Sequence, residues 1–590
     1  MNVAEKYDIA VIGGGIGGLC TAIAAARHGA KTVLIQDRPV LGGNASSEVK
    51  MHICGASCHG KFPNRRETGI IEEILLENKH RNPEHSYALF DTLLWGKAMF
   101  QENLTLHLNT YMTEVDASNN TIHKIKAVQL TTEKMYEIEA KIFVDATGDG
   151  TLSYLAGAEF MYGREDKCTF GENNAVAKGD SVTMGNSIMF KAVDAGHPVS
   201  FEKPFWAHDY KNSEWVKRIK WVEITSGYWW LELGGTELNV ISDAEETKDE
   251  LLKIIYGIWD YIKNTGDERA TNLVLDWVGM IPAKRESRRI VGDYILTEND
   301  LENSVSFEDT VAYGGWHVDA HPPERFLNHT VKGIEPTEDK TRWLDDIYEI
   351  PYRCLYSKNI ENLMLAGRLI SVSHRAFAST RVMGTCAVCG QAVGTAAALA
   401  IHNNILPREV GNKIKELQQI LLKDDCYLPN VVNSDETDIA RTSKISCSDE
   451  NQGYECGNVV KSITRCKDNQ SNMWATKVCN QPWIKLELAK KEKIKEIRLV
   501  FDSDLSTEIM PSVSKWVQDK QSKNVPDTLV RDYKIECLEK DKKVYEETVK
   551  NNYQRLRVHL LNEVMCDTVK ITVNATNGCE EARIFEIRAY

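Results

Sequence analysis

The chain contains 590 residues, of which 42% are hydrophobic, and it carries a formal net charge of −14. This length exceeds that of one ordinary domain and predicts two or three domains. Surfaces that bind nucleic acid are usually strongly basic, so the negative charge argues against nucleic acid as the main partner. No uninterrupted run of about 18 apolar residues occurs, which predicts that no segment spans a membrane.

The start of the chain and its cysteine content both favour a cytoplasmic location. The first apolar strand begins a few residues after Met1 and leaves no room for a secretion signal. The 15 cysteines are an odd number, which suits free thiols in a reducing compartment. We therefore expect a cytoplasmic protein.

Residues 8–48 have the pattern of a unit that holds a dinucleotide. The expected elements are a strand over Ile9 to Ile12, a helix from about Leu19 to His28, and a second strand over Thr32 to Ile35. Between the first strand and the helix lies Gly13-x-Gly15-x-x-Gly18. These glycines allow a tight turn, a close approach of the backbone to the pyrophosphate, and close packing of helix on sheet.

The residue that contacts the adenosine ribose is less clearly marked. The usual acidic position after the second strand holds Gln36, and Asp37 follows it. Either side chain can bond a ribose hydroxyl, so both stay candidates.

Three later segments separate FAD from other dinucleotides. They are the small-residue turn Leu41 to Ser47, the strand and turn Ile142 to Gly150, and a final group made of Asn362 to Arg368, Arg381 to Thr385 and a small-residue helix over Cys386 to Ala400. With the first unit, they resemble FAD-dependent oxidoreductases of the glutathione-reductase-like superfamily, and more narrowly a bacterial group with the motifs LIQDRPVLGGN, VDATGDG and RVMGT…GQAxG. The resemblance covers about residues 5 to 405.

This resemblance implies FAD as cofactor and a set of residues around it. The implied shell comprises Gly13, Gly15, Gly18, Gln36, Asp37, Gly43, Asn44, Thr147, Gly148, Gly367, Arg381, Met383, Gly384 and Thr385. It also implies that the last helix points its N-terminus at the flavin.

Composition changes along the chain predict the domain organisation. We expect an α/β Rossmann-type FAD-binding domain over residues 1–160 and 341–423, interrupted by an inserted α+β substrate domain over residues 161–340. The insertion is rich in aromatic residues, which are Phe205, Trp206, Trp215, Trp221 and Tyr228 to Trp230. In two-domain flavoproteins such an insertion covers the flavin ring.

Residues 430–590 have the alternating pattern of an all-β sandwich. The expected strands are Trp483 to Leu488, Ile494 to Phe501, Tyr533 to Leu538, Gln554 to Leu560 and Val569 to Val573. This region resembles discoidin-like, galactose-binding-like modules. Many such modules bind sugars, and others only cap or dimerise their enzyme, so glycan binding and a homo-oligomer both stay open.

Four residues are candidates for catalysis. His374 is the first choice for an acid or base, because the loop at that place lies against the flavin in the superfamily it resembles and imidazole titrates near neutral pH. Arg375 can hold an anionic group or polarise an oxygen. The alternative is that His374 only bonds a backbone carbonyl. Arg285 can bind a carboxylate or sugar hydroxyls, or belong to a structural ion network.

His317, Asp319 and His321 form an H-x-D-x-H string. In isolation this string suggests a metal site, but the flanking glycines and prolines predict a loop, and a polar substrate wall is favoured. His317 is therefore the fourth catalytic candidate.

Two cysteine pairs have the short spacing that metal or redox sites use. Cys54 and Cys58 lie beside His52 and His59, but no second cysteine pair follows at zinc-finger spacing. Cys386 and Cys389 lie in the predicted small-residue helix, where packing is favoured over redox or metal chemistry. The sequence therefore predicts no metal.

These observations favour an FAD enzyme that abstracts a hydride from a small polyhydroxylated or acidic molecule, with a carbohydrate or glycoside as the leading class. A first alternative is a fumarate-reductase-like enzyme that reduces an activated double bond, with Arg375 or Arg381 as the acid. A second is a glycan-binding module on a flavin scaffold. A tRNA-modifying flavoprotein fits the fold, but the acidic charge and the lack of a basic tail oppose it.

Overall fold

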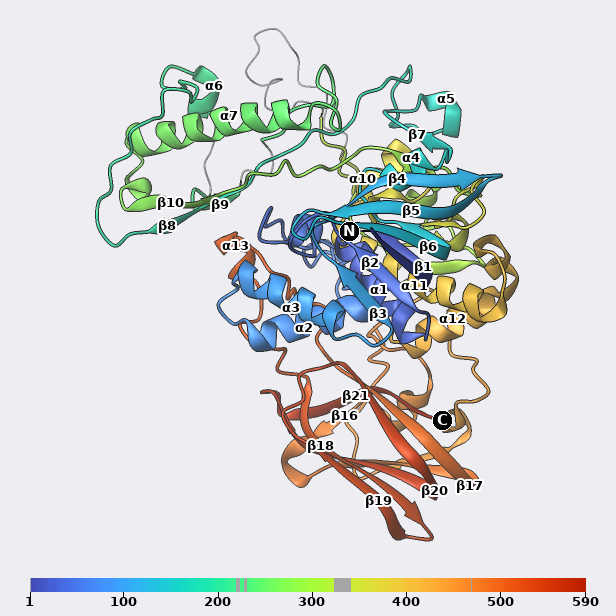
Figure 1. The fold of residues 1–590 in the computed structure, drawn as a ribbon. Coiled ribbons are helices and arrows are strands. Elements are labelled where there is room, and N and C mark those ends of the chain that lie inside the picture. The colour runs from blue at the N-terminus through green and yellow to red at the C-terminus, as the bar shows by residue number, and fades with distance from the viewer. Residues whose placement is uncertain (1, 219–222, 228–230, 323–340, 468) are drawn as a thin grey trace.

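The computed structural model describes residues 2–218, 223–227, 231–322, 341–467 and 469–590. The aromatic residues Trp221 and Tyr228 to Trp230 of the predicted lid lie outside this part of the chain. Figure 1 shows three regions: a central α/β body, a unit that projects to one side of it, and a β-sandwich below.

The central body is built on a seven-stranded sheet. Five strands are parallel, in the order β3 (Leu104–His107), β2 (Thr32–Ile35), β1 (Asn2–Ile12), β6 (Lys134–Asp145) and β14 (Leu363–Leu365). The antiparallel strands β5 (Thr121–Gln129) and β4 (Thr110–Ser118) continue from β6. The central strands are buried apolar runs, as parallel sheets covered on both faces require.

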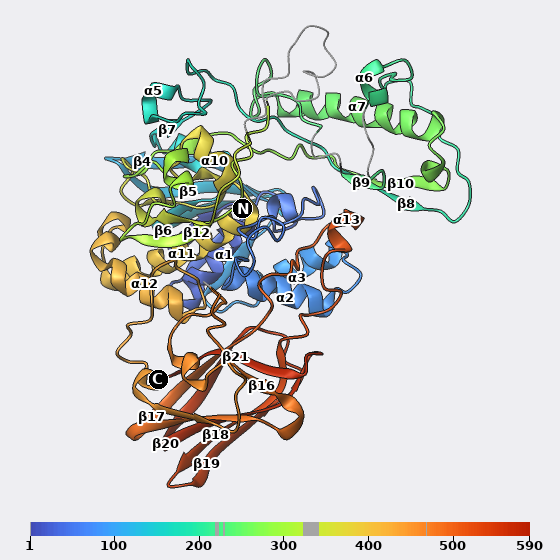
Figure 2. The same cartoon turned by 180° about the vertical axis from the view of Figure 1, so that it is seen from behind.

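Helices lie beside this sheet in the central body (Figure 1 and, from behind, Figure 2). They include α1 (Ile16–Arg27), α2 (Ile70–Arg81), α3 (Tyr87–Met99), α10 (His374–Thr380), α11 (Met383–Asn403) and α12 (Ile414–Lys423). Helices α1 and α11 pack closely because glycines of α11 lie directly against the backbone of α1. A Cβ on Gly390 would lie 2.2 Å from the Gly17 carbonyl oxygen, and a Cβ on Gly394 would lie 2.1 Å from the Thr21 carbonyl oxygen. Cys386 and Cys389 are both buried in α11.

Among the residues that the structure describes, α11 is the one helix long and apolar enough to cross a membrane. However, 94% of its most apolar window is buried inside the protein. Its composition is therefore explained by its central place in the core.

The lateral unit, residues 186–278, has a hydrophobic core of its own. Its elements are β8 (Phe190–Asp194), α6 (Glu214–Arg218), β9 (Ser226–Gly227), α7 (Ala244–Asn264) and β10 (Leu273–Val278). The apolar face of α7 packs on the three-stranded antiparallel sheet. Short elements connect the unit to the body: α4 (Thr151–Leu155), β7 (Phe160–Met161), α5 (Lys167–Phe170), β11 (Arg289–Ile290), α8 (Glu298–Glu302), β12 (Thr310–Gly314) and β13 (Tyr348–Pro351).

The C-terminal sandwich consists of antiparallel strands. They are β15 (Lys444–Cys447), β16 (Trp474–Lys477), β17 (Trp483–Phe501), β18 (Val530–Glu539), β19 (Lys542–Val549), β20 (Leu556–Thr576) and β21 (Glu581–Ala589). Together with the central body, this region confirms the predicted fold class. The domain boundaries given above remain predictions.

The sandwich sends one segment, residues 503–518, back to the other two regions. The guanidinium of Arg66 bonds the backbone carbonyls of Ser503 (3.1 Å) and Asp504 (3.0 Å). Ser57 Oγ bonds the carboxylate of Glu508. Just before the short helix α13 (Lys515–Gln518), Ser514 Oγ donates to Glu223 at 2.6 Å. The sandwich is therefore joined to the body by specific buried polar contacts.

Replacing Arg66 with alanine is expected to lower the free energy of unfolding by about 3–5 kcal/mol. Arg66 is 3% exposed and pairs with the buried Glu72 at 2.7 Å, so its removal leaves an uncompensated carboxylate in the interior. Denaturant unfolding measures the effect. Lys126→Ala is the control, because Lys126 pairs with Glu114 at the surface, and it should leave the midpoint unchanged. Equal midpoints for both variants would contradict the structural role of Arg66.

Candidate functional site

A cleft of about 440 Å³ follows the glycine turn after β1. Its lining includes most of the predicted FAD shell: Gly13, Gly15, Gly18, Gln36, Asp37, Gly43, Asn44, Thr147, Gly148, Gly367, Arg381 and Met383. Gly384 and Thr385 do not line it. Gly384 instead lies against the carboxylate of Glu67. The approach is so close that a Cβ added to Gly384 would lie 2.8 Å from Glu67 Oε1. We call this cavity the nucleotide cleft.

The glycine turn has the shape that a diphosphate requires. Gly13 has φ +110°, and a Cβ there would lie 2.1 Å from the Ala146 carbonyl oxygen. A Cβ on Gly18 would lie 2.0 Å from the Gly13 carbonyl oxygen, which keeps the turn tight. By contrast, a Cβ on Gly15 would meet nothing within 4 Å, so this backbone faces the open cleft. Gly15 is also the N-cap of α1, where backbone N–H groups lack helical partners. These residues fit an FAD diphosphate.

Gln36 and Asp37 differ in how much of each side chain is left for a ligand. Gln36 is buried, its Oε1 accepts a hydrogen bond from Gly14 N at 2.6 Å, and its Nε2 donates to the Val40 carbonyl at 3.3 Å. Asp37 is exposed and lines the cleft. The side-chain amide of Gln36 therefore already shapes the turn, and the carboxylate of Asp37 is the freer of the two.

Several cleft residues were not anticipated from the sequence. These are Arg38, Thr110, Tyr111, Met112, Asp149, Ile241, Lys284 and Arg368. Arg38, Asp149 and Arg368 lie within the motif segments but were not assigned to the shell, whereas the other five come from segments with no glycine motif.

A second cavity of about 350 Å³, which we call the inner pocket, adjoins the nucleotide cleft. Asn44, Lys284, Arg368, Arg381 and Met383 line both cavities. Met383 is the first residue of α11, so the positive end of this helix lies at the junction. The inner pocket is further lined by Met51, His52, Cys54, His59, Ser187, Met189, Ala283, Arg285, Trp316, His317, Asp319, His321 and Val382.

Asp319 is the centre of an ion network in this pocket. Its Oδ2 lies 2.8 Å from His321 Nε2 and 3.1 Å from Arg381 NH2, and its Oδ1 lies 3.7 Å from His317 Nε2. Burial alone would raise the pKa of Asp319, but these three cations hold it well below its usual range. The carboxylate is therefore ionised, and the histidines of the H-x-D-x-H string both pair with its aspartate.

The other face of His317 lies against sulfur and aromatic rings. Its Nδ1 is 3.5 Å from Cys58 Sγ, and its ring stacks on Trp343 with centroids 4.4 Å apart. Burial lowers the pKa of His317, yet hydrogen bonds to Asp319 and Cys58 outweigh burial and raise it to about 9. His317 is thus an imidazolium at neutral pH.

Arg285 extends the network toward the lateral unit. Its NH2 lies 3.2 Å from Glu232 Oε1, and its NH1 donates to Ser187 Oγ at 2.9 Å. Glu232 also pairs with His321. Arg285 therefore lines the pocket, where it can reach a substrate, and it also belongs to an ion network. The two roles predicted for this residue are compatible.

His374 and Arg375 are not in either cavity. His374, the first residue of α10, places Nδ1 2.8 Å from the buried carboxylate of Glu286. Arg375 pairs with Glu298 at 2.6 Å. Both side chains are buried in the body, and the structure does not bring them to the lining of the nucleotide cleft or the inner pocket. The expectation that His374 faces the flavin is therefore not supported by its position.

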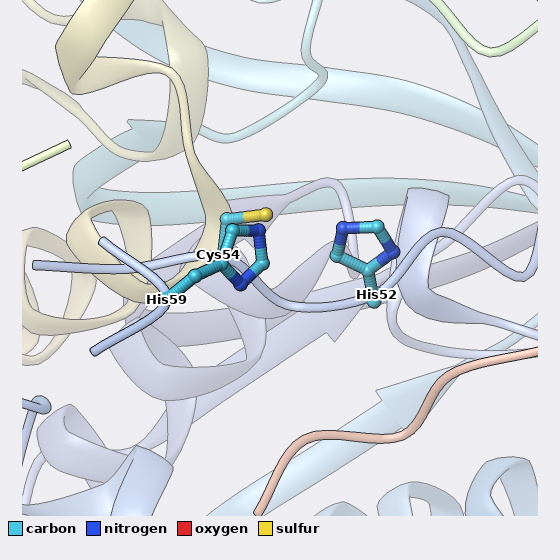
Figure 3. A group of neighbouring side chains, drawn as sticks. All are labelled: His52, Cys54 and His59. Atoms are coloured by element: carbon cyan, nitrogen blue, oxygen red, sulfur yellow. The ribbon is translucent and has the colours of Figure 1, made fainter. Parts of the chain in front are cut away.

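One wall of the inner pocket carries His52, Cys54 and His59, which Figure 3 shows as neighbouring side chains. A ligand atom of each lies within 4.8 Å of those of the other two. Burial lowers the pKa of His52 to about 3 and that of His59 to about 4. Burial also raises the pKa of Cys54 well above its usual range.

Comparison with solved structures returns small sugar-binding modules, each covering about a quarter of this chain. A fucose-binding module of Streptococcus pneumoniae, SpX-3, is 14% identical with a TM-score of 0.21, and it covers 26% of this chain and 96% of its own. The family 32 module of NanJ from Clostridium perfringens, solved with galactose, is 17% identical with a TM-score of 0.19, over 26% and 96%. Scores this low carry no argument about a ligand.

Comparison with curated proteins gives a tRNA uridine 5-carboxymethylaminomethyl modification enzyme, MnmG, of Streptococcus agalactiae. The two are 28% identical over 211 residues, which are 33% of this chain and 31% of the relative. The chain thus matches about a third of that protein's length. The family described as FAD dependent oxidoreductase matches residues 8–421, which include the nucleotide cleft and the inner pocket. The chain belongs to this family of FAD-dependent oxidoreductases, and FAD is its cofactor.

Proposed function

We propose that this enzyme oxidises a small polyhydroxylated or acidic molecule, with carbohydrates as the leading class, in the inner pocket. The observation that carries the proposal is the contact between the two cavities, which share five lining residues, among them Met383, the first residue of α11. A substrate in the inner pocket therefore lies next to the inner end of a cofactor in the nucleotide cleft.

The chain's residues suggest how FAD would be held. The turn from Gly13 to Gly18 and the N-terminus of α1 would receive the diphosphate, and Asp37 would bond the adenosine ribose. The flavin end would then lie near Met383 and Arg381. The Nε of Arg381 is buried and has no hydrogen-bond partner among the described residues, so it is available to a bound group. When bound, FAD supplies the acceptor for the two electrons of the oxidation.

The inner pocket offers the groups that such a substrate needs. Arg285 and Arg381 can hold a carboxylate or hydroxyl oxygens with charge-assisted hydrogen bonds. The Trp316 ring can pack on the apolar face of a sugar ring. The His317 imidazole, once it has lost a proton, can accept the proton of the hydroxyl that is oxidised. Asp319, whose Oδ1 lies 3.7 Å from His317 Nε2, stabilises the imidazolium that then re-forms.

Anaerobic mixing with a panel of sugars, sugar acids and glycosides tests the proposal. At least one member is expected to bleach the flavin absorbance, because oxidation of the substrate reduces the bound cofactor. Neutral polyols without a ring serve as the comparison for the role of Trp316. Unchanged absorbance across the whole panel would contradict the proposed substrate class.

A second candidate is reduction of an activated double bond. The imidazolium form of His317, with its pKa near 9, favours this reaction, since a proton donor is required at the reduced carbon. Arg381 lies beside it on the same carboxylate. Chemically reduced enzyme should then be reoxidised by enoates and not by ketones. Reoxidation by ketones alone would exclude this candidate.

A further inference from the structure

The structure brings together three metal-binding side chains on the wall of the inner pocket. His52 and Cys54 are buried, while His59 is more exposed. Their donor atoms lie within 4.8 Å of one another, and all three residues line the same cavity (Figure 3). The short spacing of His52 and Cys54 was visible in the sequence, but the fold of the loop is what places His59 beside them.

The loop that carries these residues is fixed from three directions. Gly384 N, in the first turn of α11, donates to the Cys54 carbonyl oxygen at 2.8 Å. The buried carboxylate of Glu67 accepts a hydrogen bond from Ala56 N at 2.7 Å. Ser57 bonds Glu508 of the sandwich segment. The three side chains are thus held on a backbone that is anchored by the body and by the sandwich, as a preformed ligand site requires.

The backbone also turns sharply between the second and third donor. Cys58 and His59 both have positive φ, 50° and 55°, a conformation that residues other than glycine rarely adopt. This turn reverses the chain and returns the His59 ring toward His52, with ring centroids 5.7 Å apart. The rings of Trp316 and His59 pack in a T-shaped arrangement with centroids 5.0 Å apart, which limits the movement of His59.

We propose that His52, Cys54 and His59 bind one Zn²⁺ ion whose fourth position opens into the inner pocket. Two imidazole nitrogens and a thiolate are the ligands that Zn²⁺ prefers, and three protein ligands with one open position are typical of zinc sites that also bind a small molecule. A hydroxyl or carboxylate oxygen of a pocket ligand can occupy that position. This last step rests on the proposed function, whereas zinc binding itself does not.

Zinc analysis of the full-length FAD-containing enzyme, purified without chelator, tests the site. About one zinc per chain is expected, and the zinc X-ray absorption spectrum should show one sulfur at about 2.3 Å and two nitrogens at about 2.0–2.1 Å. In chelator-treated protein titrated with Zn²⁺ alone, Cys54→Ser should weaken binding at least 100-fold. His59→Ala should weaken binding to the same extent. Because His59 is the more exposed ligand, this variant should still fold if the Cys54 variant does not, and it then tests the site by itself.

Cys456→Ser is the matched control. Cys456, Glu450 and Cys447 form the other group of three potential metal ligands among the described residues, and they lie in the sandwich at the surface. This variant should keep the zinc content and spectrum of the wild type. The proposal is overturned if Zn²⁺-titrated wild-type protein binds no zinc, if Cys54→Ser and His59→Ala bind it as tightly as wild type, or if zinc is lost only in Cys456→Ser. Since none of these readouts needs turnover, they stay informative if the proposed substrate class is wrong.

Discussion

Replacing Gly15 with alanine is expected to weaken FAD binding at least 100-fold while leaving the protein folded. A Cβ at this position meets no protein atom within 4 Å, and φ of −61° is ordinary for alanine, so the substitution costs the fold little. The new methyl group instead projects into the space where the diphosphate approaches the backbone. A 100-fold loss corresponds to about 2.7 kcal/mol. Titration of deflavinated protein with FAD, followed by flavin fluorescence, measures it.

Two other glycines serve as controls for this result. Gly96→Ala in α3 also meets nothing within 4 Å but lies outside the cleft, and it should bind FAD as the wild type does. Gly18→Ala should lose both FAD and stability, because its Cβ would lie 2.0 Å from the Gly13 carbonyl oxygen. If Gly15→Ala kept the wild-type affinity, the diphosphate would have to lie elsewhere in the cleft.

Replacing His317 with asparagine is expected to lower the rate of flavin reduction by a substrate about 10²- to 10⁴-fold, with FAD content unchanged. This range is typical for the loss of a positioned acid or base. His317 lines the inner pocket, but it is absent from the lining of the nucleotide cleft, so the cofactor should stay bound. Anaerobic stopped-flow measurement with a substrate identified by the panel gives the rate directly.

His374→Asn is the matched control, since the sequence favoured His374 for the same role. Its side chain pairs with buried Glu286 and lies outside both cavities. This variant should lower the unfolding midpoint, because the buried Glu286 loses a hydrogen-bond partner, and it should keep the rate within a few-fold of wild type. A large loss of rate in His374→Asn with none in His317→Asn would restore the assignment made from the sequence.

The sequence predicted the FAD-binding unit because its constraints are local. Turn, helix and strand follow one another within about 30 residues, and each glycine has a steric reason that its spacing reveals. The sequence predicts a helix from about Leu19, three residues after the start of α1, because the glycine pattern assigns Gly17 and Gly18 to the turn. They lie in the first turn of the helix, where the absence of a side chain allows close packing.

In the sandwich, the alternating pattern predicted the strand residues correctly but divided two strands that are continuous. The predicted strands Trp483 to Leu488 and Ile494 to Phe501 are both parts of β17. Likewise, β20 contains the predicted strand Val569 to Val573 and all of Gln554 to Leu560 except Gln554 and Arg555. The polar residues between them suggested turns. The pairing of β17 with β20 shifts register between Glu487 and Glu492. The strands therefore pass through a bulge and do not end, and a polar segment at a bulge is hard to distinguish from a turn.

The inner pocket could be predicted only in part, because its interactions join distant segments. The H-x-D-x-H string was recognised as a polar wall, but its partners Glu232 and Arg381 lie about 60 to 90 residues away. For His374, the decisive contact is Glu286, 88 residues earlier in the chain. Pairs of this kind leave no periodic or local pattern, so only the fold shows which side chains meet.

A crystal structure of the enzyme with FAD and a substrate that bleaches it tests the account most directly. The account predicts a substrate in the inner pocket, in contact with Arg285, His317 and Arg381 and next to the flavin ring at the start of α11. A substrate bound to the sandwich, or beside His374, with the inner pocket empty would contradict it.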